Sequence, residues 1–414
     1  MSPGLQRAVW RWHMLAGLLV LPVLAWMAAT GAIYLFKPEI ERWLYADMLR
    51  ASPAPALPIE ALRARVEAAT GGTVTQVIVP ERREAWRMTL ATTGGDRTAF
   101  VDPGSGAVRG TTERGGAMQT LRTLHSLAIA GPIANAVTEI AAGWAIVLVA
   151  SGWWMWWPRR SLAVRGPPRA RGFWRDLHAT TGAVAGVVIL FLALTGMTWT
   201  GVWGSGLQAV VAATESGRPP APTGGGGHGD HHGAESLSWS RQRIAPPAAH
   251  GRAIGADVVA QIAADRGLVP PLTMTLPRDA ASPWLVAAMA TRAGDARAMY
   301  IDGADGRVLQ DARYPAFGRG ARAVEWGIAV HEGREYGEPN RWLMLAGAIG
   351  LLLLCLTAPV MLWKRRPRNV PRGGPGDARA VGAMMVAAGV LFPLTGLSMI
   401  AAGLVSFAAA RLRT

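Results

Sequence analysis

The chain has 414 residues, of which 50% are hydrophobic and only 17% are charged, with 18 Trp against 5 Tyr. This composition excludes a disordered chain, a collagen-like repeat and a small disulfide-rich secreted domain. The single cysteine, Cys355, excludes an intrachain disulfide, a Cys-x-x-Cys-His haem attachment, a cysteine zinc site and an iron–sulfur cluster of the chain's own. The hydrophobic fraction indicates a membrane protein, and the net charge of +15 must be explained by where the charges lie.

Five uncharged stretches are long enough to cross a bilayer, which takes about 20 apolar residues. They are 14–36, 140–157, 177–206, 342–363 and 380–410. The first is too long for the hydrophobic core of a usual signal peptide, so we expect it to be retained. Pro393 lies inside the last stretch and is a candidate break in it.

The basic residues are concentrated in three short segments. Residues 1–12, 158–176 and 364–379 together hold fourteen Arg and Lys but only two Asp. The long segments 37–124 and 204–340 hold 12 and 13 cations against 10 and 14 anions. Short basic loops lie on the cytoplasmic side of a membrane. We therefore expect a cytoplasmic N-terminus, two long segments outside, and no binding of nucleic acid.

The first two spans and the segment between them are repeated in the next two. A shift of 165 residues aligns His13 with His178 and Thr30-Gly31 with Thr195-Gly196; a shift of 206 aligns His125 with His331. A shift of 200 aligns 100–106 with 300–306. The sequence therefore predicts an α-helical membrane bundle of about five transmembrane helices, in a duplicated 2+2 plan plus one. Thr395-Gly396 in the fifth span is a fainter copy of the Thr-Gly element.

Each long segment is predicted to form a small α+β module. In the first, helical spacing covers 58–70, and alternating apolar residues predict strands at 74–79, 85–90 and 98–101. In the second, the helix is expected at 256–266 and the strands near 272–276, 284–289 and 298–301. Turn residues at 102–106 and 302–306 close a hairpin in each module.

The predicted domain plan alternates spans with loops and modules. It runs 1–36 (first span), 37–124 (first module), 125–157 (second span), 158–176 (basic loop), 177–206 (third span), 207–250 (His- and Gly-rich linker), 251–330 (second module), 331–363 (fourth span), 364–379 (basic loop) and 380–410 (fifth span).

Four histidines occupy matching positions at the ends of the spans. His13 and His178 open the first and third spans at the cytoplasmic face, and His125 and His331 precede the second and fourth at the outer face. The duplication thus predicts one His–His pair at each face. Two facing imidazoles can supply both axial bonds to a haem iron. One such histidine alone is more often a helix cap or a satisfied polar group, but four in matching registers favour haem.

Two sites for simple metal ions are the alternative to haem. Two imidazoles leave a divalent metal short of ligands. Glu332 and Glu335 are near enough in sequence to add to the outer pair, whereas only Asp176 lies near the inner one. Haem brings four nitrogens of its own and needs only the two histidines, so the ligand count favours haem.

Other polar residues near the spans each allow two interpretations. Glu139, the one acid inside an apolar run, has Arg341 as a candidate partner; the pair could orient a propionate, relay a proton or join two helices. Nearby arginines could bind haem propionates or anchor helices at the interface: Arg11 and Arg175 inside, and Arg122, Arg334 and Arg341 outside. The linker histidines could capture copper, zinc or iron weakly or have no role: His228, His231 and His232.

Motifs of cofactor domains and of nucleophilic catalysis are missing from the sequence. It contains no Gly-x-Gly-x-x-Gly after a strand, no P-loop and no Gly-x-Ser-x-Gly elbow. The expected cytoplasmic loops are too short for a nicotinamide or flavin domain. We therefore expect no catalytic residue beyond the haems, and a quinol or a separate cytoplasmic reductase as electron donor.

The order of these motifs over residues 5–366 resembles the PepSY-associated transmembrane proteins of the bacterial inner membrane. The resemblance is carried by Arg-x-His13-x-x-x-Gly17, Leu177-His178-x-x-x-Gly182, Leu124-His125-x5-Gly131, Val330-His331-x5-Gly337 and the two hairpins ending at Gly106 and Gly306. This group, often labelled iron-regulated membrane proteins, includes di-haem ferric-siderophore reductases.

The resemblance implies periplasmic PepSY modules and two haem b groups, with His13 and His178 as axial ligands of one and His125 and His331 of the other. It further implies an enzyme that reduces a ferric siderophore, or another metal chelate, and releases Fe(II) for iron acquisition. Two alternatives stay open: a haem-free, membrane-anchored PepSY module that binds peptides or proteins, and an accessory or transporter for metal or siderophore uptake. A visible absorption spectrum separates the reductase from both.

Overall fold

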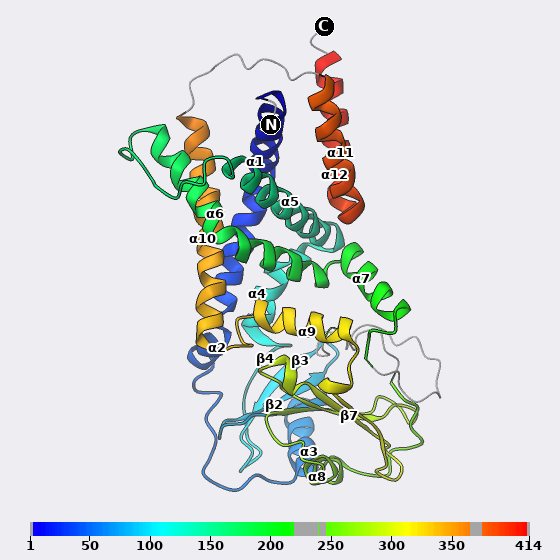
Figure 1. Cartoon of the computed structure of the whole chain (residues 1–414). Helices are drawn as coiled ribbons and strands as arrows, with labels where there is room; N and C mark the ends of the chain where they lie inside the picture. The colour runs from blue at the N-terminus through cyan, green and yellow to red at the C-terminus, as the bar shows by residue number, and fades with distance from the viewer. Residues whose placement is uncertain (1–2, 219–238, 240–245, 365–374, 412–414) are drawn as a thin grey trace. The chain divides into compact units, whose positions relative to one another are not determined.

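The computed structural model describes residues 3–218, 239, 246–364 and 375–411. The chain divides into two compact units (Figure 1). We call residues 1–35, 122–209 and 330–414 the helical unit, and residues 36–121 and 210–329 the sheet unit. His228, His231 and His232, for which we predict a weak metal-binding role, lie outside the described residues.

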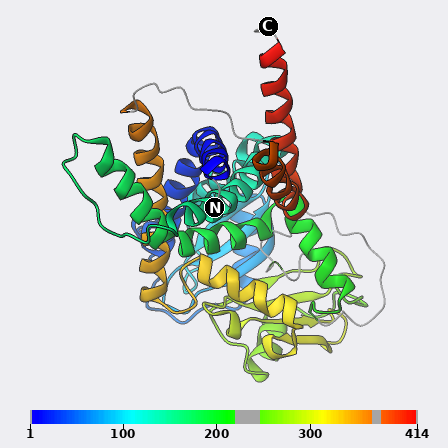
Figure 2. The same ribbon diagram turned by 45° about the horizontal axis from the view of Figure 1, so that its top comes forward.

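Four helices of the helical unit are long and apolar enough to cross a membrane. They are α1 (Pro3–Tyr34), α5 (Pro132–Trp156), α6 (Arg171–Gly196) and α10 (Glu338–Trp363). Helices α1 and α6 each pack against both α5 and α10, so the four form a closed bundle (Figure 2). The corresponding helices of the two sequence repeats, α1 with α6 and α5 with α10, therefore lie diagonally across this bundle.

The predicted fifth span is two shorter helices, α11 (Pro375–Leu391) and α12 (Pro393–Arg411). The helix breaks at Phe392 because proline has no N–H to donate and its ring disfavours helical geometry in the residue before it. The two helices pack side by side, and α11 also contacts α1 while α12 contacts α5 (Figure 1). The described residues contain four candidate spans, and the stretch predicted as one fifth helix is instead two helices.

Four further helices join the spans to the sheet strands. They are α2 (Lys37–Leu44), α4 (Gly116–His125), α7 (Val202–Ala213) and α9 (Arg319–His331). Both α4 and α9 end at one of the histidines that the sequence singles out.

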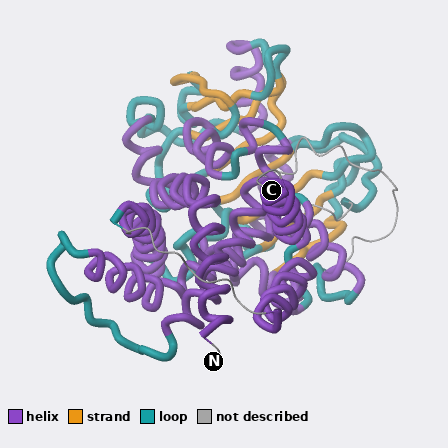
Figure 3. The backbone as a smooth tube through the Cα atoms, turned by 90° about the horizontal axis from the view of Figure 1, so that it is seen from above, coloured by secondary structure: helices purple, strands orange, loops and turns teal. Residues whose placement is uncertain are grey.

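The sheet unit contains one antiparallel sheet of eight strands (Figure 3). Its order is β4-β3-β2-β1-β5-β6-β7-β8. The strands of the first half are β1 (Thr73–Val79), β2 (Trp86–Ala91), β3 (Arg97–Val101) and β4 (Val108–Glu113). Those of the second half are β5 (Leu272–Thr275), β6 (Trp284–Ala288), β7 (Arg297–Ile301) and β8 (Val308–Arg313).

The two predicted modules are therefore halves of one sheet. Strands β1 and β5 pair in antiparallel fashion, with Val77 opposite Met274. This pairing gives both strands a partner on an edge that would otherwise present unpaired N–H and C=O groups. The six strands predicted from alternation agree with the structure to within one residue at each end, whereas β4 and β8 were expected only as the second arms of hairpins.

Helices α3 (Ile59–Thr70) and α8 (Ala256–Asp265) pack on one face of the sheet. Their inward residues and the alternate strand residues opposite them are fully buried. Examples are Leu62, Val66, Val77, Val259 and Met274. Burial of apolar area of this kind provides most of the stability of the unit.

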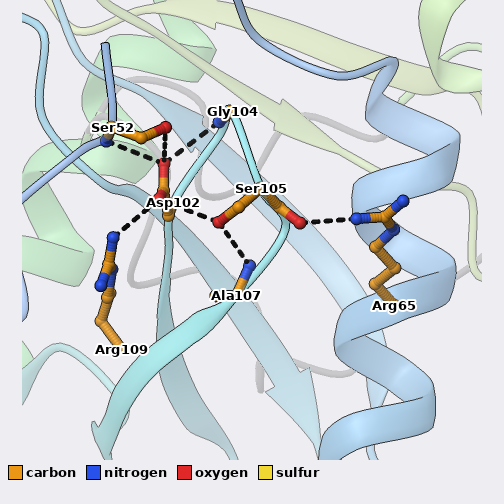
Figure 4. A network of polar contacts seen from close by, with 7 residues as sticks. All are labelled: Ser52, Arg65, Asp102, Gly104, Ser105, Ala107 and Arg109. Atoms are coloured by element: carbon orange, nitrogen blue, oxygen red, sulfur yellow. Dashed lines mark hydrogen bonds and ion pairs between the residues drawn. The ribbon is translucent and has the colours of Figure 1, made fainter. Parts of the chain in front are cut away.

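A buried aspartate secures the hairpin of each half. Asp102 is 1% exposed and accepts hydrogen bonds from the backbone N–H and hydroxyl of Ser52, at 3.0 and 2.9 Å (Figure 4). It also accepts from Gly104 N–H, from the Ser105 hydroxyl and from Arg109. These contacts tie the segment before α3 to the turn between β3 and β4.

Candidate functional site

His13 on α1 and His178 on α6 face each other inside the helical unit. Their ring centres are 6.4 Å apart and their planes are inclined by 83°. An imidazole nitrogen bonds a metal at about 2.0–2.1 Å and lies about 1.1 Å from its ring centre, so two rings on one metal have centres roughly 6.3 Å apart. Both rings line a cavity of about 580 Å³. The distance between the ring centres therefore fits two imidazoles that bind one metal ion.

A hydroxyl group fixes each inner imidazole. His13 Nδ1 lies 2.9 Å from Ser151 Oγ, and His178 Nδ1 lies 2.8 Å from Thr357 Oγ1. Each hydroxyl also donates to a backbone carbonyl three or four residues earlier on its own helix, at 2.7 and 3.1 Å. Since a hydroxyl has one hydrogen, it accepts the bond from Nδ1–H. The Nε2 lone pair of both rings is then left for a metal.

The outer histidines are held in the same way. His125 Nδ1 lies 2.9 Å from Thr30 Oγ1, and His331 Nδ1 lies 2.8 Å from Thr195 Oγ1. Both threonine hydroxyls donate to a carbonyl oxygen four residues earlier, at 2.7 and 2.6 Å. All four imidazoles therefore present Nε2 as an acceptor, which is the form that binds a metal.

The residue after each hydroxyl is small, which lets the imidazole approach the helix. These residues are Gly31, Gly152, Gly196 and Ala358. A Cβ on Gly31 would lie 3.2 Å from Cε1 of the neighbouring histidine, and one on Gly152 or Gly196 would lie 3.4 Å from it. The distance at Gly31 is tighter than ordinary van der Waals contact and those at Gly152 and Gly196 are at its lower limit, so a larger residue would push the ring away.

Each of the four histidines bonds to a hydroxyl of its own sequence repeat, whereas His13 and His178, which face each other, come from different repeats. At the outer end, burial first and the nearby His125 second lower the pKa of His331 to about 4. His331 is therefore neutral at pH 7. Trp199 packs against His331 with ring centres 6.2 Å apart and planes inclined by 77°.

Arginines line the exposed end of the inner cavity. Arg175 is among them, together with Arg7, Arg159, Arg165 and Arg171. Arg175 also pairs with Asp176 at 2.7 Å. Arg11 is exposed and is not among the residues that line the cavity. Positive charge here favours acidic groups on a bound molecule.

The outer arginines have partners of their own. Arg334 pairs with Glu332 at 2.6 Å, and Arg341 pairs with Glu338 on the first turn of α10. Arg122 is half-buried on the last turn of α4. Binding of propionates by any of the five predicted arginines stays a prediction.

The predicted pairing of Glu139 with Arg341 is wrong. Glu139 is 1% exposed and its carboxylate accepts hydrogen bonds from Val202 N–H and Trp203 N–H, at 3.0 and 3.1 Å. These amides lie on the first turn of α7 and have no acceptor within their own helix. A carboxylate satisfies them and interacts favourably with the helix dipole.

Two residues of the site, Ser151 and Thr357, were not identified from the sequence. The shift of 206 that aligns His125 with His331 also aligns Ser151-Gly152 with Thr357-Ala358. A search for hydroxyl residues at that shift would have found them. Among the described residues no three His, Cys, Asp or Glu side chains are placed to hold a metal ion, so Glu332, Glu335 and Asp176 do not complete a simple metal site.

Comparison with known proteins identifies the family. No curated protein sequence matches the chain. The family model described as the PepSY-associated TM region matches residues 10–366, a range that includes the four histidines and their hydroxyl partners. The chain therefore belongs to the PepSY-associated TM family, as its motifs predict.

Proposed function

We propose that the chain is a transmembrane electron-transfer protein that holds two b-type haems and reduces a ferric chelate, such as a ferric siderophore, outside the bacterial inner membrane. Each ferric ion takes up one electron and leaves as Fe(II) for iron acquisition. The observation that carries this proposal is the set of four imidazoles with Nδ1 bonded to a hydroxyl, two of them 6.4 Å apart in one cavity. Bound haem supplies the one-electron iron couple.

The inner cavity fits the proposed cofactor in size and chemistry. Its volume of about 580 Å³ lies within the range of roughly 300–1,000 Å³ found for ligand sites. Leu148, Leu351 and Leu354 on its walls exclude water, and the arginines lie at its exposed end. His13 and His178 would hold the iron. The small residues Gly17 and Gly182 on the same walls leave room for a flat ring.

We assign the outer pair to the second haem because each of its histidines is held by a hydroxyl in the same way as the inner two. His125 and His331 would be its ligands, with Thr30 and Thr195 fixing their orientation. Because two histidines would hold the iron, the chelate would receive its electron without binding to that iron. The chain then needs no catalytic acid or base.

The basic loops indicate the orientation of the protein in the membrane. By the positive-inside rule, 158–176 and 364–379 are cytoplasmic and the sheet unit is periplasmic. The electron donor would then be a quinol of the bilayer or a cytoplasmic reductase.

A visible spectrum of the purified protein from haem-replete cells tests the proposal. We expect a Soret band and, after dithionite, an α-band, with two haems per chain. His13→Ala and His125→Ala should each remove about half of the haem, and His250→Ala, at an exposed histidine of the sheet unit, should remove none. Anaerobic mixing of the reduced protein with ferric and cupric chelates then identifies the acceptor. A colourless protein would instead favour a haem-free PepSY binding module or uptake accessory.

A further inference from the structure

We propose that Glu139 is a positioning residue for His331. Its carboxylate holds a short elbow, formed by η2 (Met197–Trp199) and the first turn of α7, and this elbow holds Trp199 against the His331 ring. The assignment of His331 as a haem ligand rests on the proposed function, but the mechanical link from Glu139 to His331 does not.

The first step of this link is the attachment of the elbow to α5. Both carboxylate oxygens of Glu139 are used, Oε2 for Val202 N–H at 3.0 Å and Oε1 for Trp203 N–H at 3.1 Å. The carboxylate is buried, so these charge-assisted bonds are not weakened by water. Removing the acceptor would leave two amides of α7 without their partner.

The second step is that the elbow moves as one piece. A Cβ on Gly204 would lie 2.4 Å from the carbonyl oxygen of Thr198, so the start of α7 packs directly on the η2 backbone. Thr198 Oγ1 donates to Thr195 O at 2.8 Å, and Thr200 Oγ1 donates to Met197 O at 2.8 Å. Met197 is fully buried. A displacement of Val202 would therefore be passed to Trp199.

The third step is contact with the imidazole on two sides. Trp199 meets the ring edge-on, with ring centres 6.2 Å apart. Thr195, whose carbonyl accepts the bond from Thr198, receives the Nδ1–H of His331 at 2.8 Å. The elbow thus limits rotation of the ring and keeps Nε2 pointing one way.

The repeat that contains Glu139 differs from the other at this position. The shift of 206 places Leu345 at the position that corresponds to Glu139. A leucine cannot accept a hydrogen bond from backbone amides. Loss of the Glu139 carboxylate should therefore affect His331 and leave His13 and His178 unchanged.

The test uses the full chain in detergent, in haem-free form and haem-loaded form, with Glu139→Ala, Glu139→Gln and the control Thr138→Val. Thr138 is also buried on α5, but its hydroxyl donates to Asn135 O on its own helix.

In the haem-free protein, hydrogen exchange of the peptide covering 200–206 should be about tenfold faster in Glu139→Ala, as expected for lost hydrogen bonds. Carbethoxylation of His331, measured by mass spectrometry, should rise severalfold while that of His178 stays constant. Glu139→Gln should give intermediate values because its amide has one oxygen acceptor.

Haem-loaded protein supplies a second readout. In low-temperature electron paramagnetic resonance, the signal lost in His125→Ala belongs to the outer haem and the signal lost in His13→Ala belongs to the inner haem. Glu139→Ala should shift the signal of the outer haem and leave that of the inner haem unchanged. Faster exchange at 200–206 with unchanged labelling of His331 would overturn the positioning role and leave Glu139 as a helix cap. A protein that never binds haem would refute the proposed function, while the labelling experiment would still decide the role of Glu139.

Discussion

Glu60 and Asp257 cap each other's helices in the sheet unit. Asp257 accepts the backbone N–H groups of Ile59 and Glu60, at 2.6 and 3.2 Å, on the first turn of α3. Glu60 accepts the N–H of Ala256, at 2.6 Å, on the first turn of α8. The residues that precede the two helices, Pro58 and Gly255, make no side-chain cap of their own. Each half of the sheet therefore completes a helix of the other half.

Removing one of these caps should weaken both halves together. We expect Asp257→Ala to lower the free energy of unfolding of the sheet unit by about 1–2 kcal/mol, the usual effect of losing an N-terminal cap. Amide hydrogen exchange at the first turns of α3 and α8 measures this loss of stability in the intact chain. Asp265→Ala, at the exposed last turn of α8, is the control and should have less than about 0.5 kcal/mol of effect. Equal effects of the two variants would contradict the capping role.

The sheet unit should lose stability in acid through Asp302. Burial alone would raise the pKa of this carboxyl, but hydrogen bonds from Ala304 N–H and from the backbone and ring of His250 outweigh it and hold the pKa below its usual value. A carboxylate with a lowered folded pKa stabilises the protein above its unfolded pKa of about 3.9, and this contribution is lost as the pH falls through the folded value.

Asp302→Asn should therefore flatten the dependence of stability on pH below about pH 4, measured by thermal unfolding. Asp47→Asn, at a side chain that is 88% exposed, should leave that dependence unchanged and serves as the control. A slope in Asp302→Asn that equals the wild-type slope would show that this carboxylate does not govern acid unfolding.

The hydroxyl partners of the histidines should control haem affinity. We expect Thr357→Val to weaken retention of the inner haem by about 10–100-fold, because the imidazole loses the acceptor that fixes its orientation. Transfer of haem to an excess of apomyoglobin, followed by absorbance, measures this rate. Thr180→Val on α6 is the control, because Thr180 has a buried hydroxyl for which no hydrogen-bond partner is found among the described residues. Equal rates for both variants would count against the role of Thr357.

The glycine beside an outer histidine should tolerate no side chain. A Cβ on Gly31 would lie 3.2 Å from His125 Cε1, so Gly31→Val should displace the ring and remove the outer haem while the inner one remains. Haem content per chain and the reduced spectrum report the result. Gly382→Val on α11, where a Cβ would meet no atom within 4 Å, is the control and should retain both haems. Full haem content in Gly31→Val would mean that the ring does not need this space.

Local patterns were sufficient to predict the four candidate spans and most strands, but long-range contacts were not predictable. The apolar runs, the turn at Asp102 and the duplicated histidines are visible in short windows of sequence. The pairing of β1 with β5 depends on two segments about 200 residues apart, and no local signal specifies it. Similar depth in the membrane makes Arg341 a candidate partner of Glu139, but the carboxylate instead accepts hydrogen bonds from two amides at the start of α7, a segment more than 60 residues away in sequence.

The pairing of β1 with β5 has a consequence for how the two halves of the chain depend on each other. Val77 lies opposite Met274 in an antiparallel register, which is the arrangement that two copies of a single half would adopt around a twofold axis. A fragment containing only the first four strands would thus expose unpaired N–H and C=O groups along β1, and we expect it to form homodimers by pairing through this strand. Covalent fusion replaces a concentration-dependent association with an intramolecular one, so both sets of histidines are always present in equal number.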